Sequence, residues 1–265
     1  MTLQVIVATM HQTDHSLLDR MNIQSDAIVC NQCDRNEVEE FEYNGHHIKW
    51  MSFAERGVGL NRNNGLMRAT ADIVMFADDD VVYLDGYPEI VLNYYERNPQ
   101  ADVTVFNLAK RRSTSEHFVD YVNKNRRITK YSATKFSTVT FSARRDSIEF
   151  ANVVFHRNFG GGTKYSCGED TLFLQDCIKK KLKVFSSTLK IGYVTHGEST
   201  WFKGYNDKYF FDKGVLYYMI DKRIAKCYAL YHCFKHKKMY SEYGWRNGYK
   251  KMCEGIKSVK RMRRS

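Results

Sequence analysis

Short apolar runs alternate with stretches of helical periodicity along most of this sequence, and the alternation limits the possible folds more than any other feature. The apolar runs predict buried strands at residues 3–9, 26–30, 47–51, 73–76, 103–107, 137–142, 183–185 and 191–195. The stretches between them predict helices at residues 16–21, 59–69, 87–98, 144–152 and 170–181. This order predicts an α/β fold with a first half rich in βαβ units and a mixed second half.

Polar residues stand just past the ends of three predicted strands. They are Thr9, Asn31 and Asp78. In an open α/β sheet, ligands bind beyond the carboxyl ends of the strands. We therefore expect a nucleotide pocket that collects these three side chains.

Acidic residues gather at two places in the sequence. Asp78, Asp79 and Asp80 close one apolar run, and Glu169 and Asp170 follow a glycine-rich stretch. A carboxylate is least unfavourable in a solvated or metal-filled cleft, because a buried unpaired charge is costly. Oxygen ligands of this kind suit Mg²⁺ and Mn²⁺. The two groups together predict a metal-dependent group transfer from a charged donor.

Composition sets the scale of the fold and its compartment. A chain of 265 residues, 43% of them hydrophobic, can bury one domain or one domain with an appendage. Seven cysteines, scattered through apolar runs, predict reduced thiols in the cytosol, and the pair Cys30 and Cys33 has no second pair at zinc-ligand spacing. The first residues lack the features of a signal peptide, and no apolar run is long enough to cross a bilayer. We expect a chain that does not span a membrane.

Positive charge is concentrated at the end of the chain. From residue 222 onward there are 14 Lys and Arg but only two acidic residues, so this segment carries the excess behind the net charge of +11. Its charges are interleaved with aromatic residues, as in an amphipathic segment that lies on anionic lipid. A solvated basic helical face and nucleic-acid binding are the alternative interpretations.

Two longer motifs carry a resemblance to a known family. They are GLNRNNGL at 59–66 with IVMFADDD at 73–80, and FGGGTKYSCGEDTLFL at 159–174. In this order they closely resemble the helix, the DXD segment, the glycine loop and the ED motif of family 2 glycosyltransferases. With STWF at 199–202 near His196, the chain is similar over about residues 3–212 to bacterial enzymes that build capsular or other surface polysaccharides.

The resemblance implies a GT-A fold, which is a Rossmann-like mixed sheet flanked by helices, here followed by a basic amphipathic helical segment. It also implies an inverting transfer from a nucleoside-diphosphate sugar, usually a UDP-sugar. The donor would be bound by Thr9, Asn31, Arg62, Asn63, Asp78, Asp79 and Gly161. At Gly161, backbone without a side chain would approach the donor sugar, although a flexible turn is the alternative. Asn31 stands where many relatives carry an acidic residue, and its amide could still hydrogen-bond a uracil edge.

The metal and the general base follow from the same resemblance. Asp80, with His196, would hold Mn²⁺ or Mg²⁺ against the diphosphate, whose negative charge grows as the glycosidic bond breaks. Asp170 would accept the proton of the acceptor hydroxyl, and Glu169 would orient the site. The alternatives are an acidic turn or cap at residues 78–80, a structural histidine, and acidic residues that only favour a helix N-terminus.

These inferences predict a catalytic domain at residues 1–212 and a C-terminal basic helical extension at residues 213–265. The enzyme would move a hexose or N-acetylhexosamine from a UDP-sugar to a lipid-linked glycan, in the cytoplasm at the inner face of the cell membrane, with no nucleic acid as partner. One alternative is a nucleotidyltransferase acting on sugar phosphates, although the sequence lacks its phosphate loop near the first strand. Another is a non-enzymatic module that binds anionic surfaces or nucleic acid through the basic segment.

Overall fold

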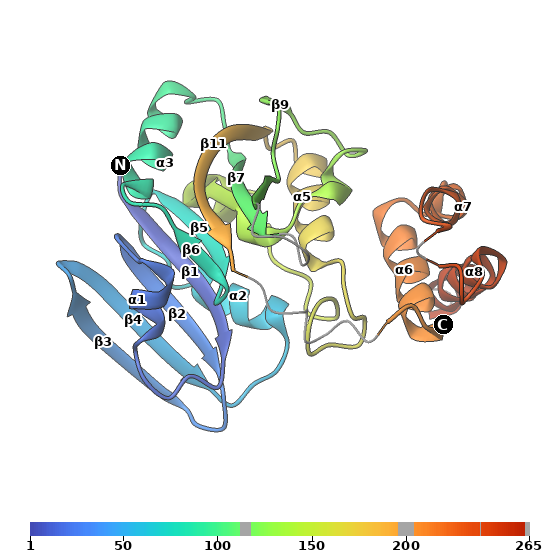
Figure 1. The fold of residues 1–265 in the computed structure, drawn as a ribbon, viewed down its shortest axis with the longest axis horizontal. Coiled ribbons are helices and arrows are strands. Elements are labelled where there is room, and N and C mark those ends of the chain that lie inside the picture. The colour runs from blue at the N-terminus through green and yellow to red at the C-terminus, as the bar shows by residue number, and fades with distance from the viewer. Residues whose placement is uncertain (112–117, 196–203, 239, 263–265) are drawn as a thin grey trace.

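The computed structural model describes residues 1–111, 118–195, 204–238 and 240–262. Within them the chain forms an 11-stranded mixed sheet in the order β3-β4-β2-β1-β5-β10-β7-β11-β6, with β8 beside β7 and β9 beside β11 (Figure 1). The strands are β1 (Leu3–Met10), β2 (Asp26–Gln32), β3 (Glu37–Tyr43), β4 (His46–Phe53), β5 (Ile73–Asp78), β6 (Val81–Tyr83), β7 (Val103–Arg111), β8 (Phe118–Asp120), β9 (Arg126–Arg127), β10 (Phe141–Arg144) and β11 (Val184–Val194). The predicted α/β fold with a mixed sheet is confirmed.

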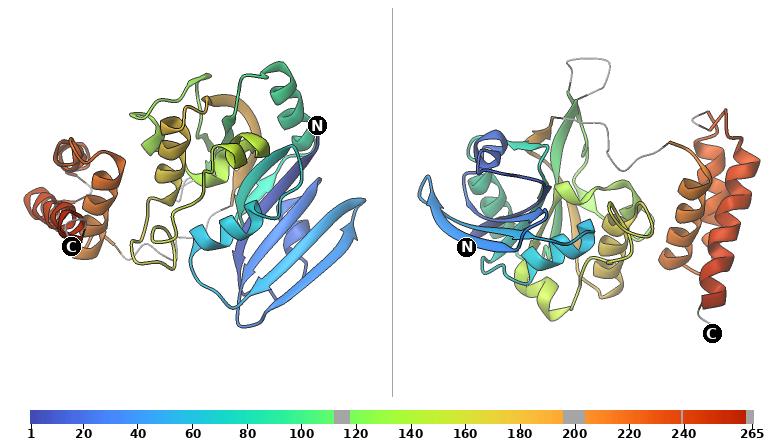
Figure 2. Two further views of the ribbon diagram at one scale, coloured as in Figure 1. Left: turned by 180° about the vertical axis from the view of Figure 1, so that it is seen from behind. Right: turned by 90° about the horizontal axis from the view of Figure 1, so that it is seen from below.

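Both faces of the sheet are buried, because alternate residues of each central strand point to opposite sides. Along β1, Val5 and Val7 belong to one apolar core and Ile6 to the other. Helices α1 and α3 contribute to the first core, and α4 and α5 to the second (Figures 1 and 2). The helices that pack against the sheet are α1 (Leu17–Met21), α2 (Val58–Leu66), α3 (Tyr87–Arg97), α4 (Arg145–Phe150) and α5 (Glu169–Lys179).

Three further helices form a separate layer at one side of the molecule, clearest in the right-hand view of Figure 2. They are α6 (Asp207–Ile220), α7 (Ala225–Lys235) and α8 (Trp245–Met262). Their own apolar core includes Phe159, Tyr165 and Leu172 from the body that carries the sheet. Glycines allow close packing of α6 and α8, because a Cβ on Gly214 would collide with the backbone of Met252 and one on Gly255 with that of Phe211. The predicted C-terminal helical segment is thus present as a packed layer.

The predicted domain boundary at residue 212 falls inside α6, which is continuous from Asp207 to Ile220. A division at that point would cut a helix, so the start of α6 is a better limit between the two parts. The division into two domains stays a prediction. None of the helices in the described parts of the chain is long and apolar enough to cross a membrane.

Some strands differ from their predictions for physical reasons. The sequence did not indicate β3, an edge strand whose residues Glu37, Glu40 and Glu42 lie at or near the surface and interrupt the apolar pattern; charges of this kind protect an open sheet edge. The predicted strands 183–185 and 191–195 are one strand, β11, with register shifts against β7 between Ser186 and Gly192. An irregularity of this type interrupts the apolar alternation, so the sequence pattern predicts two strands where the structure has one.

The segment at 137–142 was predicted as a strand and is only partly one. Residues 138–140 form a 3₁₀ turn, η2 (Thr138–Thr140), and the strand β10 begins at Phe141. A second such turn, η1 (Ala133–Lys135), precedes it. The Thr140 hydroxyl, just before Phe141, bonds locally to the backbone by donating to Ser137 O over 2.6 Å. Local bonding of this kind competes with a sheet ladder.

Candidate active site

The carboxyl ends of β1, β2 and β5 meet at one edge of the sheet. Because these strands are parallel, Thr9 lies opposite Asn31, and Ala8 lies opposite Asp78. The Thr9 hydroxyl donates to Asp79 Oδ2 over 2.6 Å. The strand-end residues that the sequence singled out are therefore neighbours, and Thr9 fixes the first residue of the loop after β5.

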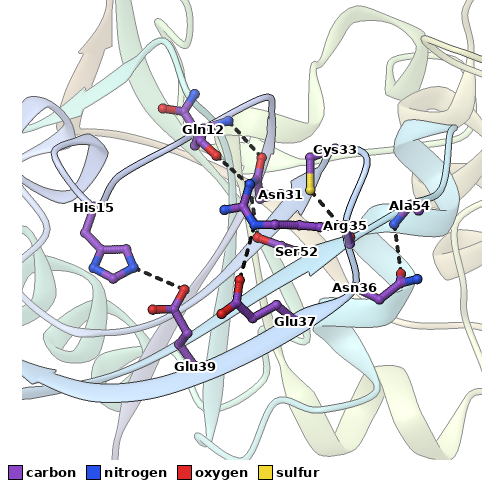
Figure 3. A network of polar contacts seen from close by, with 10 residues as sticks. All are labelled: Gln12, His15, Asn31, Cys33, Arg35, Asn36, Glu37, Glu39, Ser52 and Ala54. Atoms are coloured by element: carbon purple, nitrogen blue, oxygen red, sulfur yellow. Dashed lines mark hydrogen bonds and ion pairs between the residues drawn. The ribbon is translucent and has the colours of Figure 1, made fainter.

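Asn31 is engaged within the protein through both ends of its amide (Figure 3). Its Oδ1 accepts from Gln12 N over 3.0 Å, and its Nδ2 donates to Gln12 O over 3.0 Å and to Ser52 Oγ over 3.1 Å. Both amide hydrogens are used, so Asn31 ties the loop after β1 to β2 and β4. A direct contact from Asn31 to a nucleobase could use only the remaining lone pair of Oδ1.

A rim of polar side chains lies beside this tie, and Figure 3 shows its members His15, Arg35, Glu37 and Glu39. The His15 ring stacks on Phe41 with centroids 4.4 Å apart and lies 3.4 Å from a Glu39 oxygen. Arg35 donates to Glu37 over 3.2 Å, and both side chains are well exposed. The rim therefore presents groups of both charge signs and an aromatic face at the open end of β2, β3 and β4.

Arg62 of α2 is the central cation of the site. Its guanidinium donates to Asp78 Oδ1 over 2.6 Å and to Glu169 Oε1 over 3.2 Å, and it lies over the Phe155 ring at 5.6 Å. The Arg62 side chain is 4% exposed, the Glu169 side chain 14% and the Asp78 side chain 39%. One buried cation thus joins the end of β5 to the start of α5, although the two acidic groups are far apart in sequence.

Asn63, the next residue on α2, has a structural partner. Its Nδ2 donates to Phe155 O over 2.8 Å, and its Oδ1 accepts from Phe155 N over 2.8 Å. The reciprocal pair holds the segment before the glycine loop against α2. Asn63 therefore has a structural role in the wall of the site, and its contact with the donor stays a prediction.

The glycine loop packs between α2 and α5. Gly160 has φ +98°, and a Cβ there would lie 2.5 Å from Val58 and 2.7 Å from Glu169, so this position excludes a side chain. Gly161, the residue named from the sequence, accepts a hydrogen bond from Val58 N over 3.0 Å through its carbonyl oxygen. The requirement for glycine is therefore stricter at Gly160 than at Gly161.

Glu169 and Asp170 begin helix α5, after Gly168 with φ +114°. The Asp170 Oδ1 accepts from Thr171 N over 2.6 Å. Burial of the carboxyl group, together with repulsion from Glu169, raises the pKa of Asp170 to about 7. A carboxylate that titrates near neutrality can accept a proton during a reaction and release it afterwards.

The candidate metal ligands lie partly within the described residues. Asp80 follows β5, and its carbonyl oxygen accepts from both Thr195 N and Thr195 Oγ1 over 2.9 Å. His196 and the STWF segment at 199–202 lie outside the described residues. In the part of the chain that is described, no group of three or more His, Cys, Asp and Glu side chains is placed to hold a metal ion.

The sequence reasoning missed two residues of α6 beside this site. The carboxylate of Asp212 contacts Ser166, which precedes the acidic pair, and Lys213 interacts with Cys167 and with Asp170. The available signal was a charged pair inside the apolar run FFDKGVL at 210–216, because charges in such a run are rarely buried without partners.

Comparisons with known proteins agree on the architecture. The solved structure of S. aureus TarS residues 1–349 in complex with UDP-GlcNAc has a TM-score of 0.59 and 15% identity, with 83% of this chain and 66% of that chain covered. A longer S. aureus TarS structure has a TM-score of 0.56 and 14% identity, with 82% of this chain and 39% of that chain covered. At this identity the likeness shows the fold alone, and no curated protein matches the chain.

The family comparison covers the catalytic body. The match runs over residues 8–210, from the end of β1 into α6, and therefore includes both acidic groups, Arg62 and the glycine loop. More than half of the chain lies within it. The chain therefore belongs to glycosyl transferase family 2.

Proposed function

We propose that this protein is an inverting glycosyltransferase that moves a hexose or N-acetylhexosamine from a UDP-sugar to a glycan acceptor. Membership of glycosyl transferase family 2 and the likeness to a TarS structure solved with UDP-GlcNAc support the donor class. The observation that carries the proposal is the bridge from Arg62 to both Asp78 and Glu169. This bridge brings Asp78, at the end of β5, near Glu169 and its neighbour Asp170, which can act as a base.

The donor would lie at the carboxyl ends of β1, β2 and β5. Thr9, Asp78 and Asp79 stand at this edge. Arg62 of α2 balances the negative charge of Asp78 through their ion pair. Part of the Asp78 side chain remains exposed and can receive a ribose hydroxyl as a hydrogen-bond acceptor. Gly160 and Gly161 would let the loop backbone approach the sugar.

The residues after β5 have the right chemistry for a divalent cation. Mg²⁺ in nucleotide sites is bound by one or two carboxylates and by the phosphates of the substrate, without a complete protein cage. Asp80 would supply the first carboxylate and His196 a further ligand, for Mn²⁺ or Mg²⁺. The cation would stabilise the negative charge that develops on the leaving diphosphate.

Asp170 would act as the general base. The acceptor hydroxyl gives its proton to the Asp170 carboxylate while its oxygen attacks the anomeric carbon, and the bond to the diphosphate oxygen breaks on the opposite side. A pKa near 7 leaves much of Asp170 ionised at neutral pH and makes it a stronger base than an ordinary aspartate. Glu169, held by Arg62, would orient this end of the site.

The acceptor would be a lipid-linked glycan of bacterial surface polysaccharide synthesis, reached from the cytoplasmic face of the membrane. This part rests on the outer surface of α7, where Leu230, Tyr231 and Phe234 are exposed. Six exposed basic residues lie in α7 or next to it in the sequence, namely Lys222, Arg223, Lys226, Lys235, Lys237 and Lys238. Exposed apolar side chains among positive charges suit attachment to anionic lipid.

A panel of nucleotide sugars tests the proposed function. We expect slow release of UDP from one UDP-sugar and no comparable release from GDP- or ADP-sugars, with faster release once an acceptor is supplied. The Asp170→Asn variant is the control and should release much less UDP, because it lacks the proposed base. Release that is equal for all nucleotides, or unchanged in that variant, would contradict the proposal.

A further inference from the structure

Helix α6 contacts the segment that immediately precedes the acidic pair. Asp212 is 1% exposed. Its Oδ2 accepts from Ser166 N over 2.9 Å, from Ser166 Oγ over 2.8 Å and from Lys208 Nζ over 2.7 Å. A buried carboxylate without such partners would be strongly unfavourable, so the three donors fix Ser166 against α6.

A second contact lies one helical turn further along the same face of α6. A Cβ on Gly168 would lie 2.6 Å from Leu216 Cδ1, which leaves no room for a side chain at the position before α5. Asp212 and Leu216 are four residues apart and therefore face the same way. Asp212 and Leu216 therefore contact the two ends of the short segment from Ser166 to Gly168.

Lys213, beside Asp212, adds a positive charge near the base. Its Nζ lies 5.7 Å from the centre of the Tyr209 ring, and its charge interacts with the Cys167 side chain. Its charge lowers the pKa of Asp170, against the larger upward effects of burial and Glu169. The electrostatic environment of Asp170 thus includes a residue from the C-terminal layer.

We propose that α6 helps to position the catalytic base and that Asp212 is a positioning residue for Asp170. By holding Ser166, Asp212 sets the path of the backbone into Gly168 and hence the position of Asp170 at the start of α5. The proposal rests on the proposed function, because it assigns Asp170 the role of base. It makes the C-terminal helices necessary for catalysis apart from any role at a membrane.

Two substitutions separate positioning from general stability. Asp212→Ala removes the acceptor for Ser166, whereas Asp212→Asn keeps an amide oxygen that can still accept from Ser166 N. Asp207→Asn is the matched control, because Asp207 is on the same helix but pairs with Lys251 and Tyr243 within the helical layer. We expect Asp212→Ala to lower kcat by roughly 10- to 100-fold, since misplacement by about 1 Å can cost that much.

The expected pattern has three further parts. The KM for the donor should stay within about twofold of the unmodified protein, because the proposed nucleotide-binding groups lie at the carboxyl ends of β1, β2 and β5 and not at Ser166. Asp212→Asn should recover most of the lost kcat, and Asp207→Asn should retain full kcat. Hydrogen exchange at the amides of residues 164–168 should accelerate in Asp212→Ala alone.

Several results would overturn the proposal. They are a kcat within twofold in Asp212→Ala, an equal loss in Asp207→Asn, and a donor KM that rises as kcat falls. Unchanged exchange at residues 164–168 would show that Asp212 does not hold the loop. If the unmodified protein turns over no nucleotide sugar, the proposed function fails, and the exchange measurement still decides whether α6 fixes this segment.

Discussion

Arg62 donates a hydrogen bond from Nη2 to Asp78 Oδ1 over 2.6 Å, and this bond ties helix α2 to the end of strand β5. The same guanidinium reaches Glu169, and its Nε has no hydrogen-bond partner among the described residues. Arg62 is therefore committed to two carboxylates in a buried setting. Such an arrangement is sensitive to the loss of one partner, because the remaining charges are left unbalanced.

Substitution of Arg62 should affect both stability and activity. Removal of one member of a buried ion pair costs about 3 to 5 kcal/mol, and we expect Arg62→Leu to fall near the lower limit because part of Asp78 is exposed. Urea unfolding measures this change. Arg97→Leu at the end of α3 is the control and should change the free energy of unfolding by less than about 0.5 kcal/mol. Equal stability of the two variants would contradict the central role of Arg62.

Asp80→Ala should abolish transfer if Asp80 holds the cation at the diphosphate. EDTA should inactivate the unmodified protein, and added Mn²⁺ or Mg²⁺ should restore it. The matched control is Asp146→Ala on α4, whose exposed carboxylate forms a salt bridge with Arg145 at 2.6 Å. Full turnover in EDTA would remove the metal from the mechanism.

Asp170→Asn should lower kcat by roughly 10²-fold or more while UDP binding stays near normal, since general-base catalysis typically contributes 10² to 10⁴. Asp176→Asn is the control, because Asp176 is on the same helix and pairs with Lys179 near the surface. Calorimetry with UDP and initial rates give the two quantities. A fully active Asp170→Asn variant would leave Asp170 as a residue that only favours the helix N-terminus.

The pH dependence of kcat should report the raised pKa of Asp170. Only the ionised carboxylate accepts a proton, so activity should rise with pH through about 7. Lys213 lowers the pKa of Asp170, and Lys213→Met should therefore move this limb to higher pH. Lys257→Met on α8 should leave it in place. A limb near pH 4, or no shift in Lys213→Met, would contradict the assignment.

The sequence could predict the site as far as local pattern and strand order reach. Parallel strands align their carboxyl ends, so Thr9, Asn31 and Asp78 are neighbours, as their positions in the pattern indicated. The engagement of Asn31 could not be predicted, because its partner Ser52 follows from the pairing of β2 with β4. The contact from Asp212 to Ser166 joins residues 46 apart and depends on how α6 docks.

The C-terminal segment also shows that contacts made by tertiary packing could not be predicted from the sequence. The sequence suggested one amphipathic surface with its aromatic residues toward lipid. In the structure, Tyr240 is 2% exposed, and Tyr228, Tyr243, Trp245 and Tyr249 pack against the core of the helical layer. Composition indicated a helical, basic segment but could not separate the inward from the outward aromatic residues.

The outward face of α7 allows a sharper membrane test than removal of residues 222–265, which would uncover the apolar surface of α6. The unmodified protein should sediment with anionic vesicles and less so in high salt, because each basic residue near the surface contributes about 1 kcal/mol and salt screens it. Lys226→Glu with Lys235→Glu should weaken binding strongly, and Tyr231→Ser with Phe234→Ser should weaken it at every salt concentration. Arg126→Glu with Arg127→Glu on β9 makes the same charge change at an exposed site elsewhere and should leave binding nearly intact. Equal losses in the two charge-reversed variants would mean that net charge, and not the face of α7, attracts the vesicles.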